Sequence, residues 1–280
     1  MSHEQAKIHP MAVVEAGAVI GKNVTIEPYA IIKSTVTLQD NVVIKSHAYI
    51  DGNTTIGEGT VIWPMASIGT KTQDKKFIGE KTYVQIGKHC EIREFVTINS
   101  STHEGSIVKV GDHCLIMAYC HIAHNCEVGN HVIMSNNATL AGHVIVEDYA
   151  IIAGMTPVHQ FVRIGAYAMV GGLSRVTQDI LPYTLGGGIP YKFGGINLIG
   201  LKRHNFSYEK RKALSLAFKI TFRSGLTLED AVQRIVIEVE MFDEIKHWVD
   251  FCRSSKRGIL GTQGITKCQD GEDSIECLED

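Results

Sequence analysis

Long apolar stretches, paired cysteines and an excess of positive charge are all absent from this sequence of 280 residues. No apolar run approaches the roughly 20 residues that span a bilayer, and residues 1–10 hold no signal-peptide hydrophobic segment. We therefore expect a cytoplasmic protein without stable membrane insertion. The net charge of −3 gives no overall attraction to nucleic acid, so any anion site must be a local patch.

Aromatic and charged residues are also sparse, at 7% and 20% of the chain. This composition indicates a soluble protein whose core is built from aliphatic side chains. The seven cysteines form an odd count without CxxC spacing, which argues against a disulfide framework.

What the sequence does contain is an aliphatic residue at every sixth position through most of its first 176 residues. The run opens with Ile8, Val14, Ile20, Ile26, Ile32, Leu38 and Ile44. Neither the helical period of 3.6 nor simple alternation produces this spacing. A six-residue period is typical of a parallel β-helix, in which each coil buries its apolar face by stacking on the next.

Three cysteines, Cys114, Cys120 and Cys126, are six residues apart and look at first like metal ligands. Together with Cys90 they occupy the small position, four residues after an aliphatic one, that alanine or valine fills in other repeats. Free cysteine behaves as a small hydrophobic residue in a core. We therefore predict that these cysteines are structural.

The repeat also predicts the organisation of the first part of the chain. A β-helix is expected over residues 1–190, interrupted by loops at 70–85 and 99–109. Loops that leave a rigid scaffold are where binding groups usually lie. Residues 178–197 are rich in glycine and proline, and this stretch is predicted to be a connecting loop.

Helical patterns follow, and they predict a C-terminal α-helical domain over residues 191–260. Ser207 is a predicted N-cap for a helix over 208–222, and Thr227 with Asp230 resembles a capping box that opens a second helix. A third helix is expected from 243 to 252. Residues 261–280 are acidic with few apolar side chains, and they are expected to form a disordered tail.

Stacked coils also predict which residues meet in space. Three faces of six residues close a triangular coil, so residues 18 apart lie above one another at the strand spacing of about 4.8 Å. His124 then lies under Gly142 and Gln160. Neighbouring columns bring further side chains to the same outer edge, which gathers His121, His124, His143, His159 and Gln160.

A cluster of this kind suits two chemistries. Three histidines could hold zinc with an open water position, as in carbonic anhydrases built from hexapeptide repeats. Alternatively, one histidine is a general base and its neighbours bind substrate. The period does not choose between them. Solitary histidines such as His47, His89, His113 and His131 share one repeat position and need no function.

Several stretches of the chain together resemble one family of hexapeptide-repeat enzymes. They read IHPMAVVEAGAVIG, ASIGTKTQDKK, HIAHNCEVGNHVIMSNNATLAGHV, GMTPVHQFVRIG, MVGG and NLIGLKR. They are similar to the UDP-N-acetylglucosamine O-acyltransferases, which begin lipid A synthesis in Gram-negative bacteria. The resemblance extends from about residue 5 to residue 257.

The resemblance implies a left-handed β-helix and a homotrimer with its active sites in the grooves between subunits. It implies transfer of a long acyl group of about myristoyl length, usually 3-hydroxyacyl, from acyl carrier protein. The acceptor is the glucosamine 3-hydroxyl of UDP-N-acetylglucosamine. Neither a metal nor a cofactor takes part in the family reaction.

Residue by residue, the resemblance implies that His124 is the general base, since a hydroxyl is a weak nucleophile without one. The backbone N–H of Gly142 matches the oxyanion donor, and Gly172 matches the residue that limits acyl length. Both glycines could also simply serve tight corners. The implied binding residues are Asp74, Lys76, His121, Asn125, His143, His159 and Gln160 for sugar and acyl groups, and Asn197 and Arg203 for UDP. Arg203 also belongs to a basic stretch that could dock acidic acyl carrier protein.

The chain departs from the family pattern at four positions. Asn125 follows the implied base where many members have aspartate, and an amide orients an imidazole but supplies no charge. Ile199 replaces an acidic nucleotide contact, His204 replaces a second arginine, and Pro190 stands where some relatives have a histidine. The partner that orients His124 and the length of the acyl group therefore stay open.

Three rival functions stay open beside this one. An N-acyltransferase acting on a related UDP-sugar carries an extra N-terminal domain, whereas repeats here start at Ile8. The others are a zinc enzyme of the carbonic anhydrase type and a trimeric scaffold without catalysis.

Overall fold

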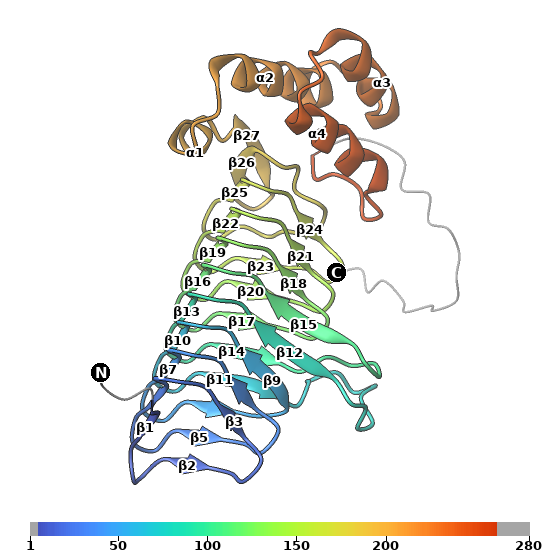
Figure 1. Ribbon diagram of the computed structural model, residues 1–280. Helices are drawn as coiled ribbons and strands as arrows, with labels where there is room; N and C mark the ends of the chain where they lie inside the picture. The colour runs from blue at the N-terminus through green and yellow to red at the C-terminus, as the bar shows by residue number, and fades with distance from the viewer. Residues whose placement is uncertain (1–4, 262–280) are drawn as a thin grey trace.

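The structure is a computed structural model that describes residues 5–261. Its main body is a left-handed parallel β-helix made of three sheets, and a cluster of four helices lies at the end opposite the N-terminus (Figure 1). Residues 262–280, most of the predicted acidic tail, lie outside the described residues.

Successive strands from β1 to β25 enter the first, second and third sheet in turn, so each sheet collects every third strand, and β26 and β27 extend the first sheet. The first sheet contains β1 (Lys7–Ile8), β4 (Thr25–Ile26), β7 (Val43–Ile44), β10 (Val61–Ile62), β13 (Glu91–Ile92), β16 (Leu115–Ile116), β19 (Ile133–Met134), β22 (Ile151–Ile152), β25 (Met169–Val170), β26 (Thr184–Gly187) and β27 (Lys192–Ile196). The second contains β2 (Val13–Val14), β5 (Ile31–Ile32), β8 (Tyr49–Ile50), β11 (Ser67–Thr70), β14 (Thr97–Asn99), β17 (His121–Ile122), β20 (Thr139–Leu140) and β23 (Pro157–Val158). The third contains β3 (Val19–Ile20), β6 (Thr37–Leu38), β9 (Asn53–Ile56), β12 (Tyr83–Ile86), β15 (Ile107–Val110), β18 (Glu127–Val128), β21 (Ile145–Val146) and β24 (Arg163–Ile164).

The six-residue period fills the core as predicted. The repeated aliphatic residues point inward and are almost fully buried from Ile26 to Val176. Cys90, Cys114, Cys120 and Cys126 are free thiols, each at most 2% exposed, in the small inward position. Burial raises the pKa of the Cys120 thiol to about 11, which keeps it protonated and unreactive at neutral pH. The structural prediction for these cysteines is confirmed.

Between strands the chain turns at three kinds of corner, which we call the first, second and third edges because they follow strands of the first, second and third sheet. Many corner residues are not glycine yet have positive φ, among them His113, His131 and Tyr149. Such a backbone is unfavourable for most side chains. Stacking of the aromatic rings of successive coils offsets this unfavourable backbone conformation. The His131 ring lies 4.9 Å from that of His113 and 4.5 Å from that of Tyr149, centre to centre.

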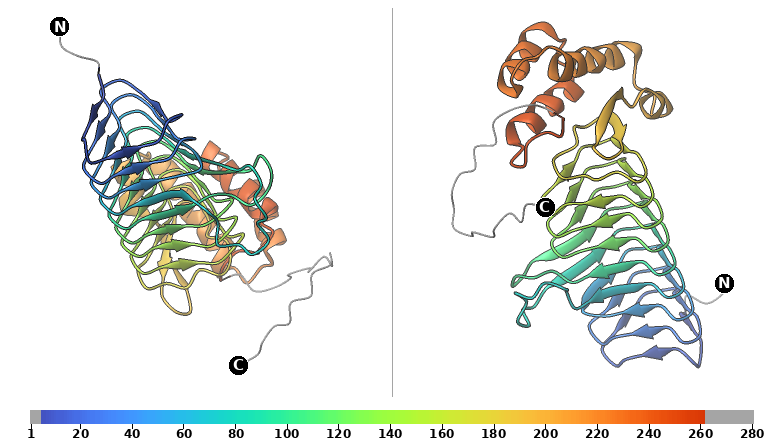
Figure 2. Two further views of the ribbon diagram at one scale, coloured as in Figure 1. Left: turned by 90° about the horizontal axis from the view of Figure 1, so that it is seen from below. Right: turned by 180° about the vertical axis from the view of Figure 1, so that it is seen from behind.

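Two loops leave the solenoid at the second edge. The first runs from residue 71 to 82, after β11, and the second from 100 to 106, after β14. Both project from the same side of the column (Figure 2). Beyond them the strands still pair in register, Ile68 with Ile98 and Ile98 with Ile122, because both insertions are multiples of six residues. The loops therefore reach outward while the column keeps its register, apart from a bulge between Ile68 and Thr70 where the first loop begins.

Residues 178–197 differ from the prediction of a connecting loop. They contain β26, which pairs in parallel with β25, and β27, which pairs with β26 in antiparallel fashion. The glycines allow close packing, since a Cβ on Gly186 would lie 2.6 Å from the Tyr191 ring. The hairpin also spans residue 190, where the β-helix was expected to end.

The C-terminal helices are α1 (Leu198–Arg203), α2 (Tyr208–Arg223), α3 (Leu228–Glu238) and α4 (Asp243–Ser254). The last three were predicted, and both predicted caps are present: Ser207 accepts from the N–H of Lys210 and Thr227 from that of Asp230. The short α1 was missed. No helix in the described part of the chain is long and apolar enough to cross a membrane.

The helices are held to the β-helix by packing and by polar contacts. Arg163 of β24 lies over the ring of Phe251, 4.2 Å from its centre. His247 of α4 places Nε2 2.9 Å from a Glu147 carboxylate oxygen and Nδ1 2.9 Å from the hydroxyl of Tyr183. These contacts fix the position of α4 relative to the last coils.

Candidate active site

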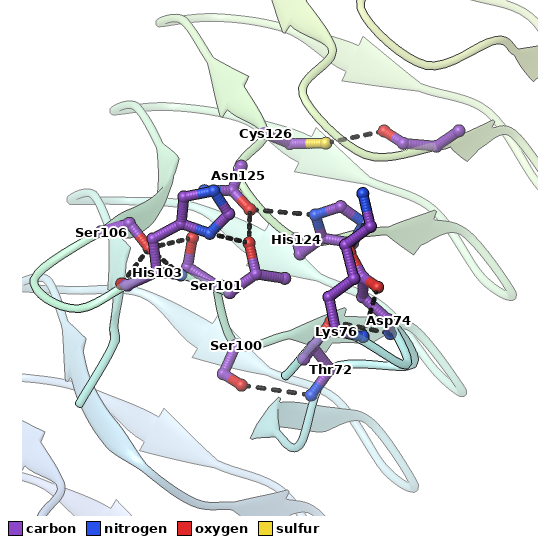
Figure 3. A network of polar contacts seen from close by, with 12 residues as sticks. Thr72, Asp74, Lys76, Ser100, Ser101, His103, Ser106, His124, Asn125 and Cys126 are labelled. Carbon is purple, nitrogen blue, oxygen red and sulfur yellow. Dashed lines mark hydrogen bonds and ion pairs between the residues drawn. The ribbon is translucent and has the colours of Figure 1, made fainter. Parts of the chain in front are cut away.

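The second edge carries a group of polar side chains around the corner that follows β17. His124 lies at this corner, and Gly142 and Gln160 occupy the same position in the next two coils. Both loops leave from this edge, so Asp74 and Lys76 of the first loop and His103 of the second lie beside His124 (Figure 3). The structure therefore brings together residues from four separate segments.

A hydrogen bond holds the His124 ring at one of its two nitrogens. Nδ1 lies 2.9 Å from Oδ1 of Asn125, and an amide oxygen only accepts hydrogen bonds. In the neutral imidazole, Nδ1 therefore carries the proton and Nε2 has the lone pair. That nitrogen faces Asp74, whose Oδ2 is 3.7 Å away. This separation is too long for a hydrogen bond and leaves Nε2 available to a substrate.

The first loop is fastened so that Asp74 stays in place. Its own backbone N–H donates to Oγ1 of Thr72, and its Oδ1 accepts from the N–H of Lys76 at 2.9 Å. The N–H of Thr72, a buried residue, in turn donates to Oγ of Ser100 in the second loop. The two loops are thus tied together beneath the carboxylate.

Two more predicted histidines surround His124. The His143 ring meets the His124 ring edge-on at 5.2 Å and stacks on Phe161 at 4.6 Å, centre to centre. His121 lies within 2.7 Å of the Thr97 hydroxyl. Burial, followed by the proximity of His124, lowers the pKa of both His121 and His143 below the ordinary value of 6.5. Both are therefore neutral at pH 7, which limits positive charge around His124.

The His124 ring leaves no room for a side chain at Gly142. The φ of Gly142 is not positive, and a Cβ placed on it would lie 2.5 Å from Nε2 of His124. The residue is thus glycine because the imidazole occupies the space, and the reading as an ordinary tight corner does not hold. The Ala141 carbonyl, in the same peptide unit as the Gly142 N–H, accepts from the Cys126 thiol at 3.1 Å.

At some corners of the β-helix, though not at all of them, the backbone N–H equivalent to that of Gly142 is bonded to a side chain. There a side-chain oxygen of a neighbouring coil accepts this hydrogen bond, as Asp112 does for Lys88 at 2.8 Å and Asp148 does for Asn130 at 2.7 Å. For Gly142, no acceptor is found among residues 5–261. Its N–H is therefore available to a ligand beside Nε2 of His124.

The remaining predicted residues lie on the second edge, on the first edge and at the start of α1. His159 and Gln160 are exposed on the second edge, and His159 Nδ1 lies 3.2 Å from the Gln160 carbonyl oxygen. Gly172 lies on the first edge, following β25. Asn197 caps α1, accepting from the N–H of Gly200 and donating to the Tyr167 carbonyl.

Arg203 lies in the last turn of α1 and lines a cavity of about 740 Å³ between the first sheet and α2. Asn197, Ile199 and the apolar side chains of Ile151, Met169 and Leu185 line it too. This cavity opens beside the first sheet, whereas His124 lies on the second edge. Within one protomer the structure does not bring Asn197 and Arg203 to His124.

The structure shows the surroundings of two residues at which the chain departs from the family pattern. His204 ends α1, and its ring meets Tyr149 and Tyr167 at 4.8 and 5.2 Å, so it packs the helix on the aromatic column of the third edge. Ile199 is 68% exposed beside the cavity. Sequence reasoning missed Thr102 and His103, whose only signal is the polar composition of the second loop.

Comparison with known proteins places this arrangement in a family. Residues 179–260 match the family model described as UDP-N-acetylglucosamine O-acyltransferase, domain 2, and residues 107–142 match the bacterial transferase hexapeptide model. A relative from Chlamydia abortus, named acyl-[acyl-carrier-protein]–UDP-N-acetylglucosamine O-acyltransferase, is 57% identical over 270 residues, 96% of each chain. The chain belongs to the UDP-N-acetylglucosamine O-acyltransferase family.

Solved structures agree with this membership. A UDP-N-acetylglucosamine acyltransferase from Bacteroides fragilis superposes with a TM-score of 0.88 at 40% identity, covering 90% of this chain and 99% of its own. One from Campylobacter jejuni gives 0.85 at 42% identity, covering 92% and 100%. The resemblance predicted from the sequence is confirmed over the solenoid and the helices alike.

The packing around Gly142 predicts the effect of one added methyl group. In Gly142→Ala the Cβ must displace the His124 ring, and a shift of about 1 Å in a reacting group can lower the rate about 100-fold. We expect a fall of that order in kcat for acyl transfer to UDP-N-acetylglucosamine, with an unchanged thermal midpoint and circular dichroism spectrum. A fully active Gly142→Ala protein would show that the contact with His124 has no bearing on turnover.

Proposed function

We propose that this protein transfers a fatty acyl group of about myristoyl length, with a 3-hydroxyl group, from acyl carrier protein to UDP-N-acetylglucosamine. The acceptor is the glucosamine 3-hydroxyl, and the reaction is the first step of lipid A biosynthesis, in the cytoplasm. The observation that carries the proposal is the pair formed by the open Nε2 of His124 and the unbonded N–H of Gly142. Family membership supplies the substrates.

In this mechanism Nε2 of His124 takes the proton of the sugar hydroxyl as its oxygen attacks the thioester carbonyl carbon. The carbonyl π electrons move to oxygen, and the Gly142 N–H donates a hydrogen bond to that oxyanion. When the intermediate collapses, the carbon–sulfur bond breaks and the thiolate leaves. The imidazolium returns its proton to that sulfur, so the base is regenerated.

Asp74 supplies the charge that Asn125 lacks. As His124 takes up a proton it becomes cationic, and an opposite charge within about 4–6 Å favours the charged form. The Asp74 carboxylate lies 3.7 Å from Nε2. In this chain the stabilising charge thus lies on the substrate side of the ring, where Lys76, His143 and Gln160 are also placed to contact the sugar and the acyl group.

We further propose that the working form is a homotrimer with each site shared by two subunits. Gly172, Asn197 and Arg203 lie on parts of the protomer remote from His124, and a rigid solenoid does not fold back on itself. The first edge also carries a stripe of exposed apolar side chains, which marks an interaction surface. These are Tyr29, Met65, Phe95, Tyr119, Met155 and Leu173.

In a cyclic trimer, the second edge of one subunit faces the first edge of the next. The neighbour's Arg203 then binds the UDP phosphates in bidentate fashion, with Asn197 beside it. Lys202, Arg203 and Lys212 are exposed on α1 and α2 and offer positive charge to acidic acyl carrier protein. The same end of the groove receives both the nucleotide and the carrier.

Gly172 is proposed to limit the acyl chain. Its φ is not positive, and an added Cβ would approach the Gly154 carbonyl at 3.3 Å, a tight but adjustable contact. The backbone therefore does not require glycine here. A missing side chain leaves the first edge open to a long chain.

A pair of matched substitutions tests the base. His124→Asn removes the proton acceptor, so kcat should fall by about 100- to 10,000-fold in an acyl-carrier-protein assay. His113→Asn is the control, because His113 lies on the third edge, away from the proposed interface, at a left-handed corner where asparagine stands in other coils, as at Asn41. It should keep full activity. Equal activity of the two variants would remove His124 from the mechanism.

Mixing two inactive variants tests the shared site. His124→Asn and Arg203→Ala subunits are coexpressed with different tags, and mixed trimers are purified through both. Because purification through both tags removes the homotrimers, each remaining trimer holds one site in three that combines an intact His124 with an intact neighbouring Arg203, so activity should return to about one third of the wild-type value. No recovery in mixed trimers would place both residues in the site of a single subunit.

The acyl limit is tested by the products made from a mixture of acyl carriers. Wild-type protein should give one dominant mass near a C14 acyl chain, since each buried methylene is worth about 0.8 kcal/mol. Gly172→Met should shift the dominant product to a shorter chain, as measured by mass spectrometry. An unchanged product spectrum would mean that this residue does not contact the acyl group.

A further inference from the structure

Asn125 creates a problem that an aspartate at the same position would not. A carboxylate presents an acceptor oxygen whichever way it turns, whereas an amide presents either an oxygen or an NH₂ group. If the amide turned over, Nδ2 would donate to Nδ1 of His124 and the ring proton would move to Nε2. A histidine protonated on Nε2 alone cannot accept a proton from a substrate there.

The surroundings of His124 favour the unproductive arrangement. Asp74 holds a carboxylate oxygen 3.7 Å from Nε2, and a negative charge at this distance attracts a proton to that nitrogen. The proton placed on Nε2 would leave Nδ1 as an acceptor for the amide NH₂. Something other than Asp74 must therefore hold the Asn125 oxygen toward Nδ1.

Thr102 of the second loop is placed to do this. Its hydroxyl donates to Oδ1 of Asn125 at 2.7 Å, the same oxygen that faces Nδ1 of His124. The Thr102 hydroxyl also lies 2.8 Å from Nδ1 of His103. A hydroxyl has one proton to donate, so His103 must donate its Nδ1 proton to Thr102. The donors then run in one direction, from His103 to Thr102 to Asn125.

The loop keeps Thr102 fixed. Ser101 and Thr102 are 0% and 2% exposed, although they belong to a surface loop. Ser106 donates to the His103 carbonyl and accepts from the His103 N–H at 3.0 Å, which closes the loop on itself. Figure 3 shows His103, Asn125 and His124 as one continuous chain of contacts. A buried hydroxyl in a fixed loop has little freedom to turn away.

We propose that Thr102 is a positioning residue that locks the Asn125 amide with its oxygen toward His124, and so keeps Nε2 of His124 free as the base. His103 supports the lock by donating to the Thr102 hydroxyl. Neither residue touches the reacting atoms. The inference rests on the proposed role of His124, and it explains how asparagine serves beside a catalytic histidine.

The test is a double-mutant cycle between Thr102 and Asn125. Thr102→Val keeps the shape of the side chain and removes the hydroxyl. In the Asn125 background we expect kcat to fall about 5- to 30-fold, the range set by 1–2 kcal/mol, with KM for UDP-N-acetylglucosamine within about twofold. In the Asn125→Asp background the same substitution should change kcat less than about twofold, because a carboxylate needs no orientation.

Thr102→Ser is the conservative control, and it should restore kcat because it restores the hydroxyl. Thermal midpoints of all variants show whether the second loop still packs. An equal loss from Thr102→Val in both backgrounds would assign Thr102 to loop packing alone and overturn the lock, as would no loss in either. Full activity of His124→Asn would instead remove the base itself, so the two failures are distinguished.

Discussion

Register between stacked coils is the constraint on which the rest of this molecule depends. Each strand pairs with the strand of the same sheet in the next coil, as Ile122 pairs with Leu140. Slipping a strand by one residue would turn its buried side chains outward. A solenoid whose every coil depends on its neighbours therefore fixes the vertical position of each corner. That is how residues separated by 18 positions, such as His124 and Gly142, come to share one small space.

This constraint explains what was predictable from sequence and what was not. The six-residue period predicts the burial of Ile44 and Cys120 and the stacking of His124 beneath Gly142, because the core repeats with the same period. The hairpin of β26 and β27 lies after the period ends. Its glycine-rich sequence is typical of a loop, and only the structure shows that Gly186 packs closely against Tyr191. Thr102 had no predictable partner, because a loop residue has no place in the repeat. Its contact with Asn125 depends on how residues 100–106 fold back.

The candidate site lies at a corner whose backbone N–H has no acceptor among residues 5–261. At some other corners, side chains such as Asp148 satisfy the corner N–H of the neighbouring coil, and buried or half-buried donors without partners are unfavourable. For Gly142 the equivalent residue of the next coil is Gln160, and no such bond forms between them within residues 5–261. The coil on the other side contributes the His124 ring, so the unbonded N–H and the imidazole lie side by side. The stability lost at this one corner is small beside the many coils that remain regular.

Rigidity also dictates where the rest of such a site must come from. The solenoid holds His124 and Asp74 on one edge and holds Arg203 at a cavity beside another sheet. Stacked coils have no hinge that could close this separation, and the contacts of His247 and Arg163 hold the helical end in place. A second copy of the chain is the economical source of the missing half, because cyclic symmetry places different edges of identical subunits against each other. In the proposed trimer, the long apolar stripe on the first edge would have a partner surface, and the groove between subunits would gain a charged end for the nucleotide and an apolar length for the acyl chain.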